Sequence, residues 1–431
     1  MRADRLTATT YDPAALARFE LEPIPAGAKG IPRGFEGASV ADLVASKTPF
    51  PAPGADTPTL LLRDLELQQN IETMARYCRE HDALLAPHGK TTMSPQIIAR
   101  QIDAGAWAMT AATPTHCLVY RRLGVQRILL ANQLVSPAAV SWLCEEMTRD
   151  ADFEFYCLVD SAAGAARLAG QLERFGAPRP VRVLAEVGFV GGRSGARQSA
   201  DLAEAIAVVH SAERLELAGI ECYEGLFASN DSDSSLELVD RYLDTVAATF
   251  EALSEAAALP QRPLLSAGGS AYFDRVVAKL GGLPAQLVLR SGCYATQDGG
   301  FYQQVSPLAD RGDGPAALRN AIELWSSVLS RPEPGLVIVD FGRRDAPFDQ
   351  GLPIPVRWRA CGSPDAPLEG AKVGRLSDQH AQVIIRDDEP IEIGDSICFS
   401  ISHPCGAFDR WRLIPMVNPD GLLVGVAQTF F

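Results

Sequence analysis

The sequence predicts an α/β protein with two domains, a (β/α)8 barrel of the TIM type followed by a mainly antiparallel β domain. Between residues 57 and 305, short apolar runs alternate with longer amphipathic stretches, which is the pattern of parallel strands joined by helices. After residue 305 the helical stretches become rare, and Gly, Pro and Asp turns separate short alternating strands, as in antiparallel sheets. The chain has 431 residues and is long enough to bury a core in each domain.

The N-terminal segment, residues 1–56, is rich in Pro, Gly and Ala and shows no sustained hydrophobic period. We expect it to form an irregular arm that packs on the β domain.

The barrel region, residues 57–305, contains nine apolar runs, from TLLL at 59–62 to QLVLRSG at 286–292. A barrel of this type has eight strands, so either the first or the last run belongs elsewhere. A doubly wound open sheet is the alternative. Its glycine-rich dinucleotide-binding turn would follow the first strand, where the sequence RDLELQQN has no glycine.

The C-terminal region, residues 306–431, begins with a helical pattern, PAALRNAIELWSSVL at 315–329, and continues as short strands. The segment 388–405 has the pattern of a strand that enters a loop, which places His403 and Cys405 at a strand end.

The composition limits the partners of the protein. The chain has 53 Asp and Glu against 39 Lys and Arg, a net charge of −14 and no basic run, which argues against nucleic acid. No stretch approaches the roughly 20 apolar residues of a membrane helix, and the N-terminus lacks a signal-peptide core. Nine cysteines without CxxC pairs suit a reducing compartment. We therefore expect a cytoplasmic protein that binds neither nucleic acid nor membrane.

The candidate site residues follow predicted barrel strands, and the loops after the strands form the reaction face of such a barrel. They are Lys90, Arg193, Tyr223 with Glu224, the turn SAGGS at 266–270, and Tyr294. If the sheet closes into a barrel, these residues converge.

The turn SAGGS predicts phosphate binding, because its glycines let backbone N–H groups approach an anion at the start of the following helix. A tight strand-to-helix turn would have the same sequence. Lys90 stands among small or neutral polar neighbours. It is either an ordinary solvated lysine or, beside a phosphate, an amine that forms a Schiff base with an aldehyde cofactor. His88 either takes part in that site or packs the loop through hydrogen bonds.

His403 and Cys405, in the motif HPC, offer an imidazole and a thiolate, which are both suitable zinc ligands. At a strand end, residues two apart point to the same side. Two protein ligands with open positions suit a catalytic ion; the alternative is that neither residue binds a metal. His380, in LSDQH, is either a substrate-side residue of the same domain or a solvated residue at a strand end.

Several ordered motifs resemble one enzyme family. They are APHGKTTMSPQIIARQIDAGAWAMTAATPTHC, ILLANQLV, CYEG, SAGGS, RSGCYATQD, LSDQH and SHPCGAFDRWRLIPMV. Together they resemble the pyridoxal-phosphate enzymes of the alanine racemase-like fold (fold type III), in the branch of D-serine dehydratases, D-threonine aldolases and 3-hydroxyaspartate lyases. The resemblance extends from about residue 57 to the C-terminus and is strongest to bacterial amino acid deaminases of the D-serine dehydratase type.

The resemblance implies a role for each candidate residue. Lys90 would hold pyridoxal 5′-phosphate through a Schiff base, with His88 beside it. Tyr223 would lie near the pyridine nitrogen and Arg193 on the cofactor side, with Arg197 as a nearby competitor for that role. The phosphate would be bound by the cup residues Gly268, Gly269 and Ser270 and by Tyr294.

The resemblance also implies a divalent metal on His403 and Cys405, with Zn²⁺ expected and Mn²⁺ or Mg²⁺ as alternatives. In this family the second ligand tends to be cysteine in the dehydratases and aspartate in the D-threonine aldolases. Gln379 departs from the acidic residue common in LSDQH-type motifs, which leaves an acid/base role there in doubt.

The implied function is a lyase that converts D-serine, D-threonine or D-3-hydroxyaspartate to a 2-oxo acid and ammonia, with Lys90 removing the Cα proton. An aldolase that yields glycine and an aldehyde is the alternative. A non-catalytic pyridoxal-phosphate carrier would lack the second domain, and a racemase would need a tyrosine from it, whereas the last tyrosine of the chain is Tyr302. Family members are homodimers, which is our expectation here.

Overall fold

A computed structural model describes residues 7–51, 56–227, 233–308, 317–360 and 363–431. Parts of the predicted arm, barrel and β domain, including the first two residues of the helix predicted at 315–329, lie outside these described residues. The chain divides into two compact units. The first comprises Met1–Asp12, Met74–Lys90 and Gln101–Gly292, and the second comprises Pro13–Thr73, Thr91–Arg100 and Cys293–Phe431.

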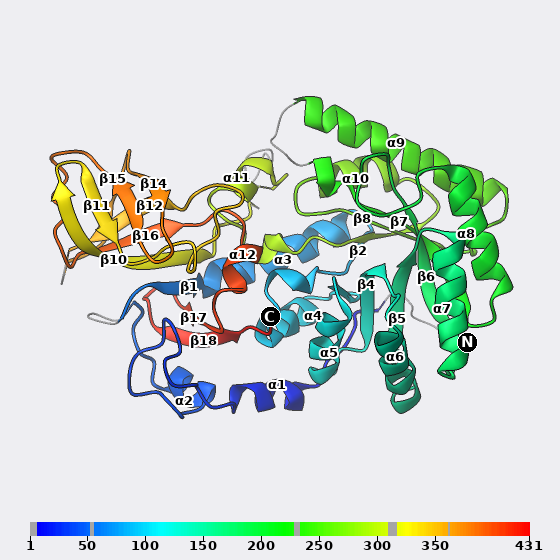
Figure 1. Ribbon diagram of the computed structural model, residues 1–431, viewed down its shortest axis with the longest axis horizontal. Coiled ribbons are helices and arrows are strands. Elements are labelled where there is room, and N and C mark those ends of the chain that lie inside the picture. The colour runs from blue at the N-terminus through cyan, green and yellow to red at the C-terminus, as the bar shows by residue number, and fades with distance from the viewer. Residues whose placement is uncertain (1–6, 52–55, 228–232, 309–316, 361–362) are drawn as a thin grey trace. The chain divides into compact units, whose positions relative to one another are not determined.

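The first unit is built on eight parallel strands, in the order β2-β9-β8-β7-β6-β5-β4-β3 (Figure 1). Backbone hydrogen bonds close the sheet, because the Trp107 N–H donates to the Leu85 oxygen at 2.7 Å and the Thr110 N–H donates to the Pro87 oxygen at 2.9 Å. The predicted barrel is confirmed. Its strands are β2 (Leu84–Leu85), β3 (Met109–Ala111), β4 (Arg127–Gln133), β5 (Glu154–Val159), β6 (Val181–Val187), β7 (Leu215–Cys222), β8 (Leu264–Ala267) and β9 (Gln286–Leu289).

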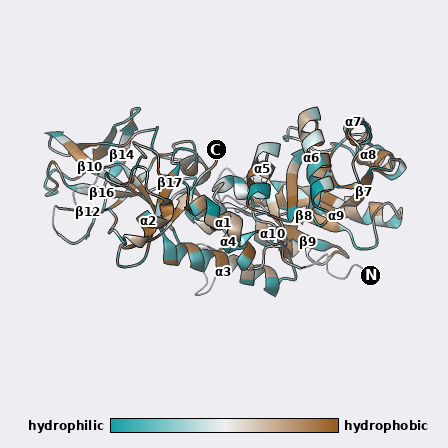
Figure 2. Cartoon of the chain, turned by 90° about the horizontal axis from the view of Figure 1, so that it is seen from below, coloured by the Kyte–Doolittle hydropathy of each residue, from teal (hydrophilic) through white to brown (hydrophobic). Residues whose placement is uncertain are grey.

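Helices alternate with these strands along the chain. The loops that lead into them supply caps: the Thr113 side chain accepts from the His116 N–H, and the Ser161 side chain accepts from the Gly164 N–H. Figure 2 shows mostly hydrophobic residues on strands such as β8 and β9 and mixed faces on the helices. The helices are α3 (Asp64–Glu80), α4 (Pro95–Asp103), α5 (Pro114–Arg122), α6 (Pro137–Arg149), α7 (Ala162–Arg174), α8 (Ser199–Ser211), α9 (Asp233–Glu255) and α10 (Phe273–Leu280).

The first apolar run, TLLL, is the one that does not belong to the barrel. It forms β1 (Thr59–Arg63) in the second unit, antiparallel to β10 (Ile322–Glu333) and parallel to β17 (Leu413–Val417). Its four residues Thr59–Leu62 are all buried, as expected for a central strand. The structural boundary therefore differs from the predicted start of the barrel at residue 57.

The helix predicted at 315–329 is wrong over its second half, where the structure has the strand β10. Trp325 and Leu324 pair with Cys398 and Phe399 on one side and with β1 on the other. The tertiary pairing of β-favouring residues overrides the local helical pattern.

The rest of the second unit is mainly antiparallel, as predicted. One path runs β13-β12-β16-β10-β1-β17-β18, and β11, β14 and β15 extend it from β10. The remaining strands are β11 (Leu336–Val339), β12 (Ile354–Arg359), β13 (Ala366–Pro367), β14 (Lys372–Leu376), β15 (Ala381–Ile384), β16 (Ser396–Ser400) and β18 (Leu423–Gln428), and two short helices are α11 (Phe301–Val305) and α12 (Cys405–Phe408).

The N-terminal arm is more regular than predicted. It contains α1 (Pro13–Glu20) and α2 (Val40–Ala45), and Ser39 and Asp42 form a capping box at the start of α2. Buried arm residues, including Val40 and Leu43, share a hydrophobic cluster with Trp325 of the β domain. The first described residues instead join the barrel unit, where the Thr9 N–H donates to the Ala106 oxygen. Within the described part of the chain, no helix is both long and apolar enough to cross a membrane.

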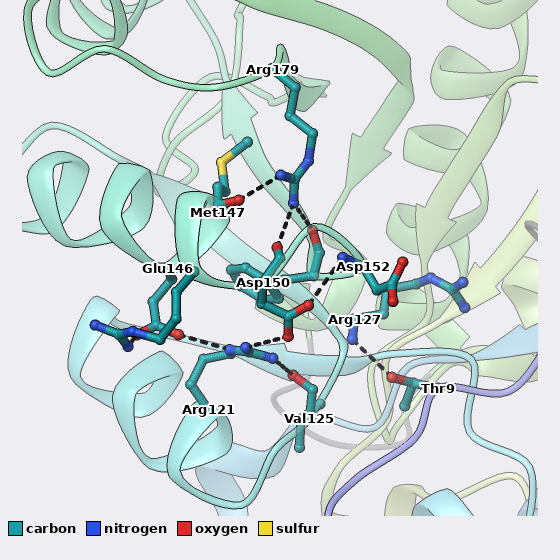
Figure 3. A network of polar contacts seen from close by, with 11 residues as sticks. Thr9, Arg121, Val125, Arg127, Glu146, Met147, Asp150, Asp152 and Arg179 are labelled. Atoms are coloured by element: carbon teal, nitrogen blue, oxygen red, sulfur yellow. Dashed lines mark hydrogen bonds and ion pairs between the residues drawn. The ribbon is translucent and has the colours of Figure 1, made fainter.

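A polar network joins the ends of α5 and α6 to the loop before β5 (Figure 3). Arg121 pairs with Glu146 at 3.2 Å and with Asp150 at 2.7 Å. Arg179 donates to three backbone oxygens in the same turn, those of residues 147, 150 and 153. Because the Arg121 side chain is only 10% exposed, these partners must offset the cost of removing its charge from water.

We expect Arg121→Ala to lower the free energy of unfolding by about 3 kcal/mol, because Asp150 loses its largely buried guanidinium partner and Glu146 keeps only Arg149. Arg33→Ala is the control, since Arg33 and Asp56 are 83% and 60% exposed and such solvated pairs contribute little to stability. Urea denaturation of both variants measures the difference. Equal losses would show that the network in Figure 3 does not stabilise the barrel.

Candidate active site

Lys90 lies in the 3-10 turn η1 (Gly89–Thr91), which follows β2, the first barrel strand. Its side chain is half-buried. Gly89 is required before it, because a Cβ there would lie 2.3 Å from the Tyr120 hydroxyl oxygen. The close approach of Tyr120 thus fixes the backbone that carries the lysine.

Two neutral histidines accompany Lys90. Burial, then the charges of Lys90 and Arg290, lower the pKa of His88 well below its ordinary value. Burial and the charge of Lys90 also lower the pKa of His116. Nδ1 of His88 is buried and, among the residues that the structure describes, has no hydrogen-bond partner. A bound ligand that reaches this nitrogen would satisfy it.

His116 was not singled out from the sequence. Its Nδ1 accepts from the Ala112 N–H at 3.3 Å, which leaves the proton of the neutral ring on Nε2. The signal that identifies it is Thr113, because this N-cap begins α5 just after β3. A residue in the first turn of that helix therefore lies close to the strand end.

The glycine turn after β8 is held by a buried carboxylate. Glu224 is fully buried, and its Oε1 accepts from the Gly269 N–H at 2.6 Å while its Oε2 accepts from the Gly268 N–H at 3.2 Å. Burial raises the pKa of Glu224, although these N–H groups oppose the shift. The prediction that the two glycine N–H groups bind phosphate therefore meets a competitor, since both already bind an anionic side chain.

The same turn is held from its other side by the segment after β9. Ser291 Oγ donates to the Gly268 and Gly269 oxygens at 3.2 and 3.0 Å, and Ser270 Oγ accepts from the Gly292 N–H at 3.3 Å. Gly268 has φ +85°, and a Cβ there would lie 2.6 Å from Leu289. Glycine is therefore needed at this position.

A buried ion pair joins β7 to the residue that follows β9. Arg290 pairs with Glu221 of β7, and its N–H donates to the Gly268 oxygen at 3.1 Å. Burial raises the pKa of Glu221 to about 7 in spite of the Arg290 charge. The pair thus couples β7 and β9 to the glycine turn.

Arg193 and Tyr223 lie together, as expected for two residues of one site. The Arg193 guanidinium is 5.2 Å from the centroid of the Tyr223 ring. Arg197, the competitor for the cofactor-side role, instead donates to the carbonyl oxygens of its own loop, at residues 192–195. Arg197 therefore shapes the loop, and Arg193 is the arginine that faces the tyrosine.

In the second unit, His403 is held at two points. Its N–H donates to Asp298 Oδ2 at 2.7 Å, and its Nδ1 lies 2.6 Å from Asp349 Oδ2. The residue has φ +80°, which is unusual for a residue other than glycine. Asp298 and Asp349 were not predicted from the sequence, because they lie 105 and 54 residues away.

Cys405 is the first residue of α12. Its Sγ lies 3.5 Å from Thr91 Oγ1 and 3.5 Å from Cys293 Sγ. The Cys293 thiol lowers the pKa of Cys405 well below its ordinary value, with His403 adding to the effect. The contact with Cys405 raises the pKa of His403 to about 9. Burial acts in the opposite direction and is the smaller effect.

His403 and Cys405 therefore interact as predicted, but not for the predicted reason. The chain leaves β16 at Ser400, turns at His403 with positive φ and then enters a helix, so strand alternation plays no part. The imidazole and thiol suit a metal such as zinc. Among the described residues, no group of three or more His, Cys, Asp or Glu is arranged to hold a metal. An ion on this pair would keep open positions, as a catalytic metal does.

The other two predicted residues of this unit differ in setting. Tyr294 is 1% exposed and lies in the turn η3 (Cys293–Ala295), directly after Cys293. His380 is exposed in the turn of the β14–β15 hairpin, where its oxygen accepts from the Ser377 N–H. His380 leads into β15, which pairs with β11 and β14. The strand that leads to His403 is β16, so the two histidines lie on different strands.

Comparisons with known proteins match both parts of the chain. Residues 65–279 match the alanine racemase N-terminal domain, and residues 321–417 match the serine dehydratase domain. A D-threonine aldolase from an Arthrobacter species is 27% identical over 304 residues, which cover 70% of this chain and 76% of that protein.

Solved structures show the same fold. D-threonine aldolase from Filomicrobium marinum is similar with a TM-score of 0.73 and 23% identity, over 87% of this chain and 95% of that one. D-threo-3-hydroxyaspartate dehydratase from Delftia sp. HT23 is similar with a TM-score of 0.71 and 19% identity, over 88% and 98%. A further dehydratase structure, with a cysteine replaced by alanine, is of a metal-free form.

We expect Glu224→Ala to lower the free energy of unfolding by about 3 kcal/mol, because two buried N–H groups lose their acceptor and each costs roughly 1–3 kcal/mol. Glu224→Gln keeps one acceptor oxygen and should lose less. The control is Glu213→Ala, at an exposed position of the same unit. Chemical denaturation measures all three variants, and equal stability of the two alanine variants would contradict the role assigned to Glu224.

Proposed function

The chain combines an alanine racemase N-terminal domain with a serine dehydratase domain in the alanine racemase-like fold, and on this premise we propose that it is a pyridoxal-phosphate- and metal-dependent lyase. It dehydrates D-3-hydroxy amino acids, D-serine or a similar compound, to a 2-oxo acid and ammonia. The observation that carries this proposal is the His403–Cys405 pair, which lies inside the matched serine dehydratase domain.

The residues around Lys90 fit pyridoxal phosphate. When bound, this cofactor supplies an aldehyde that condenses with amines and a ring that withdraws electrons from Cα. The half-buried Lys90 amine has neutral His88 and His116 beside it. A neutral amine can take the Cα proton and later donate it to another atom. The buried Nδ1 of His88 would form a hydrogen bond with a ligand bound in the same site.

The remaining cofactor contacts are part of the proposal. Tyr223 is assigned to the pyridine nitrogen, Arg193 to its side of the cofactor, and Ser270 and Tyr294 to the phosphate. Gly268 and Gly269 contribute through their lack of side chains, since a Cβ at Gly269 would lie 3.2 Å from the Tyr223 ring. Their N–H groups stay with Glu224.

His403 and Cys405 would hold the metal ion, most simply Zn²⁺, which supplies Lewis acidity to a substrate oxygen. Thr91 contacts the Cys405 sulfur and follows Lys90 directly in the chain. This covalent link supports assigning the lysine and the metal ligands to one reaction. A homodimer and a cytoplasmic location belong to the same proposal.

An aldolase is the second candidate, and a specific observation favours it. The relative with 27% identity is a D-threonine aldolase, and breaking the Cα–Cβ bond would use the same amine and the same pair of metal ligands. The cysteine ligand supports the dehydratase, because the resemblance associates aspartate with D-threonine aldolases.

We expect Lys90→Ala to lose the visible absorbance of the bound cofactor, because no amine remains to hold its aldehyde. Lys279→Ala is the control, since this lysine pairs with Asp244 on the outer helices and should keep the band. Purification of both variants with added pyridoxal phosphate, followed by absorption spectroscopy, tests this. A yellow Lys90→Ala protein with the unchanged band would refute the cofactor assignment.

Product analysis separates the two reactions. We expect D-serine, D-threonine or D-3-hydroxyaspartate to yield equal amounts of 2-oxo acid and ammonia, because the hydroxyl leaves and the enamine hydrolyses. Derivatisation of 2-oxo acids with dinitrophenylhydrazine and a glutamate dehydrogenase assay for ammonia measure these products, and the L-amino acids serve as controls. Glycine with an aldehyde would instead identify an aldolase.

A further inference from the structure

Asp349 makes a short contact with the ring of His403. Its Oδ2 lies 2.6 Å from Nδ1 of the ring, although its side chain is 52% exposed. A carboxylate can only accept, so Nδ1 carries a hydrogen, and in the neutral ring the lone pair therefore lies on Nε2. A histidine that binds a metal through Nε2 needs this tautomer.

The backbone of His403 is held separately. Asp298 is fully buried, and its Oδ1 accepts from the N–H groups of Gly300 and Tyr302 at 2.9 and 2.8 Å. Its Oδ2 accepts from the His403 N–H at 2.7 Å. This contact offsets the cost of the positive φ at His403 and fixes the point from which the ring projects.

Asp349 also lies beside the next residues of the motif. A Cβ at Gly406 would lie 3.6 Å from Asp349 Oδ1 and 3.3 Å from Arg410 Nη1. Asp349 thus lies against the backbone that follows Cys405, while Pro347, 2.9 Å from the same Cβ position, is the residue that requires glycine there. Asp298 fixes the backbone of His403 and Asp349 fixes its ring. The orientation of the imidazole is therefore set by the protein and does not depend on a bound metal.

We propose that Asp349 is a positioning residue of the metal site, which holds the His403 ring with Nε2 toward the ion and thereby sets metal affinity. The proposal rests on the proposed role of His403 as a metal ligand. It differs from an ordinary surface ion pair, whose loss would change stability slightly and leave metal affinity unchanged.

The test is zinc affinity of the protein loaded with pyridoxal phosphate, measured by competition with a chromophoric chelator. We expect Asp349→Ala to raise the zinc Kd by about 10- to 100-fold. Asp349→Asn should raise it less, because the amide oxygen still accepts from Nδ1. Asp388→Ala, at a carboxylate whose side chain is 89% exposed, should keep the wild-type Kd. The cofactor absorbance should stay unchanged in all three, and excess zinc should restore the activity of Asp349→Ala.

Two outcomes would overturn the proposal in distinguishable ways. A wild-type Kd in Asp349→Ala, together with weak binding in His403→Ala, would remove Asp349 from the metal site and leave the metal ligands assigned. A wild-type Kd in both His403→Ala and Cys405→Ala would remove the metal assignment itself, and the positioning role with it.

Discussion

The pairing of β1 with β10 and β17 is the constraint on which the arrangement of the chain depends. Because residues 59–63 complete the antiparallel sheet, the barrel begins at β2 and not at the first apolar run. Lys90 consequently follows the first barrel strand. The chain then passes from one unit to the other at the bond after Lys90 and again at the bond before Cys293, so Thr91, which contacts the Cys405 sulfur, directly follows the lysine in the chain.

The sequence predicted elements better than it predicted their partners. All nine apolar runs are strands, but nothing local distinguishes a central strand of a sandwich-like sheet from a barrel strand, since both are continuously buried. The segment 315–329 failed for a related reason. Its Ala, Leu and Arg residues favour a helix locally, whereas its strand conformation is imposed by β1 and β16, which are distant in sequence.

The site shows the same division between local and distant information. Lys90, Tyr223 and the glycine turn are visible as strand-end residues, because the loops after barrel strands carry the chemistry. Glu224 was visible only as a strand-end residue without a role, and Asp298 and Asp349 were not assigned, although each of the three has a contact that defines its neighbours. Glu224 binds a turn 45 residues later, and no periodicity or motif reports such a pairing. His403 and Cys405 were paired correctly on the wrong geometry, because a positive φ cannot be derived from the motif HPC.

These three carboxylates share one physical role. Each accepts N–H groups, from the glycine turn, from the backbone of His403 or from its ring. Buried N–H donors without acceptors would cost free energy, and a carboxylate satisfies two of them at once with directional, charge-assisted bonds. The acidic groups therefore fix the parts that would touch cofactor and metal, while burial and then the charge of Lys90 lower the pKa of two imidazoles, those of His88 and His116. Neutral imidazoles suit an amine that is to remove a proton, because a carboxylate beside the amine would favour its protonated form and oppose proton removal from the substrate.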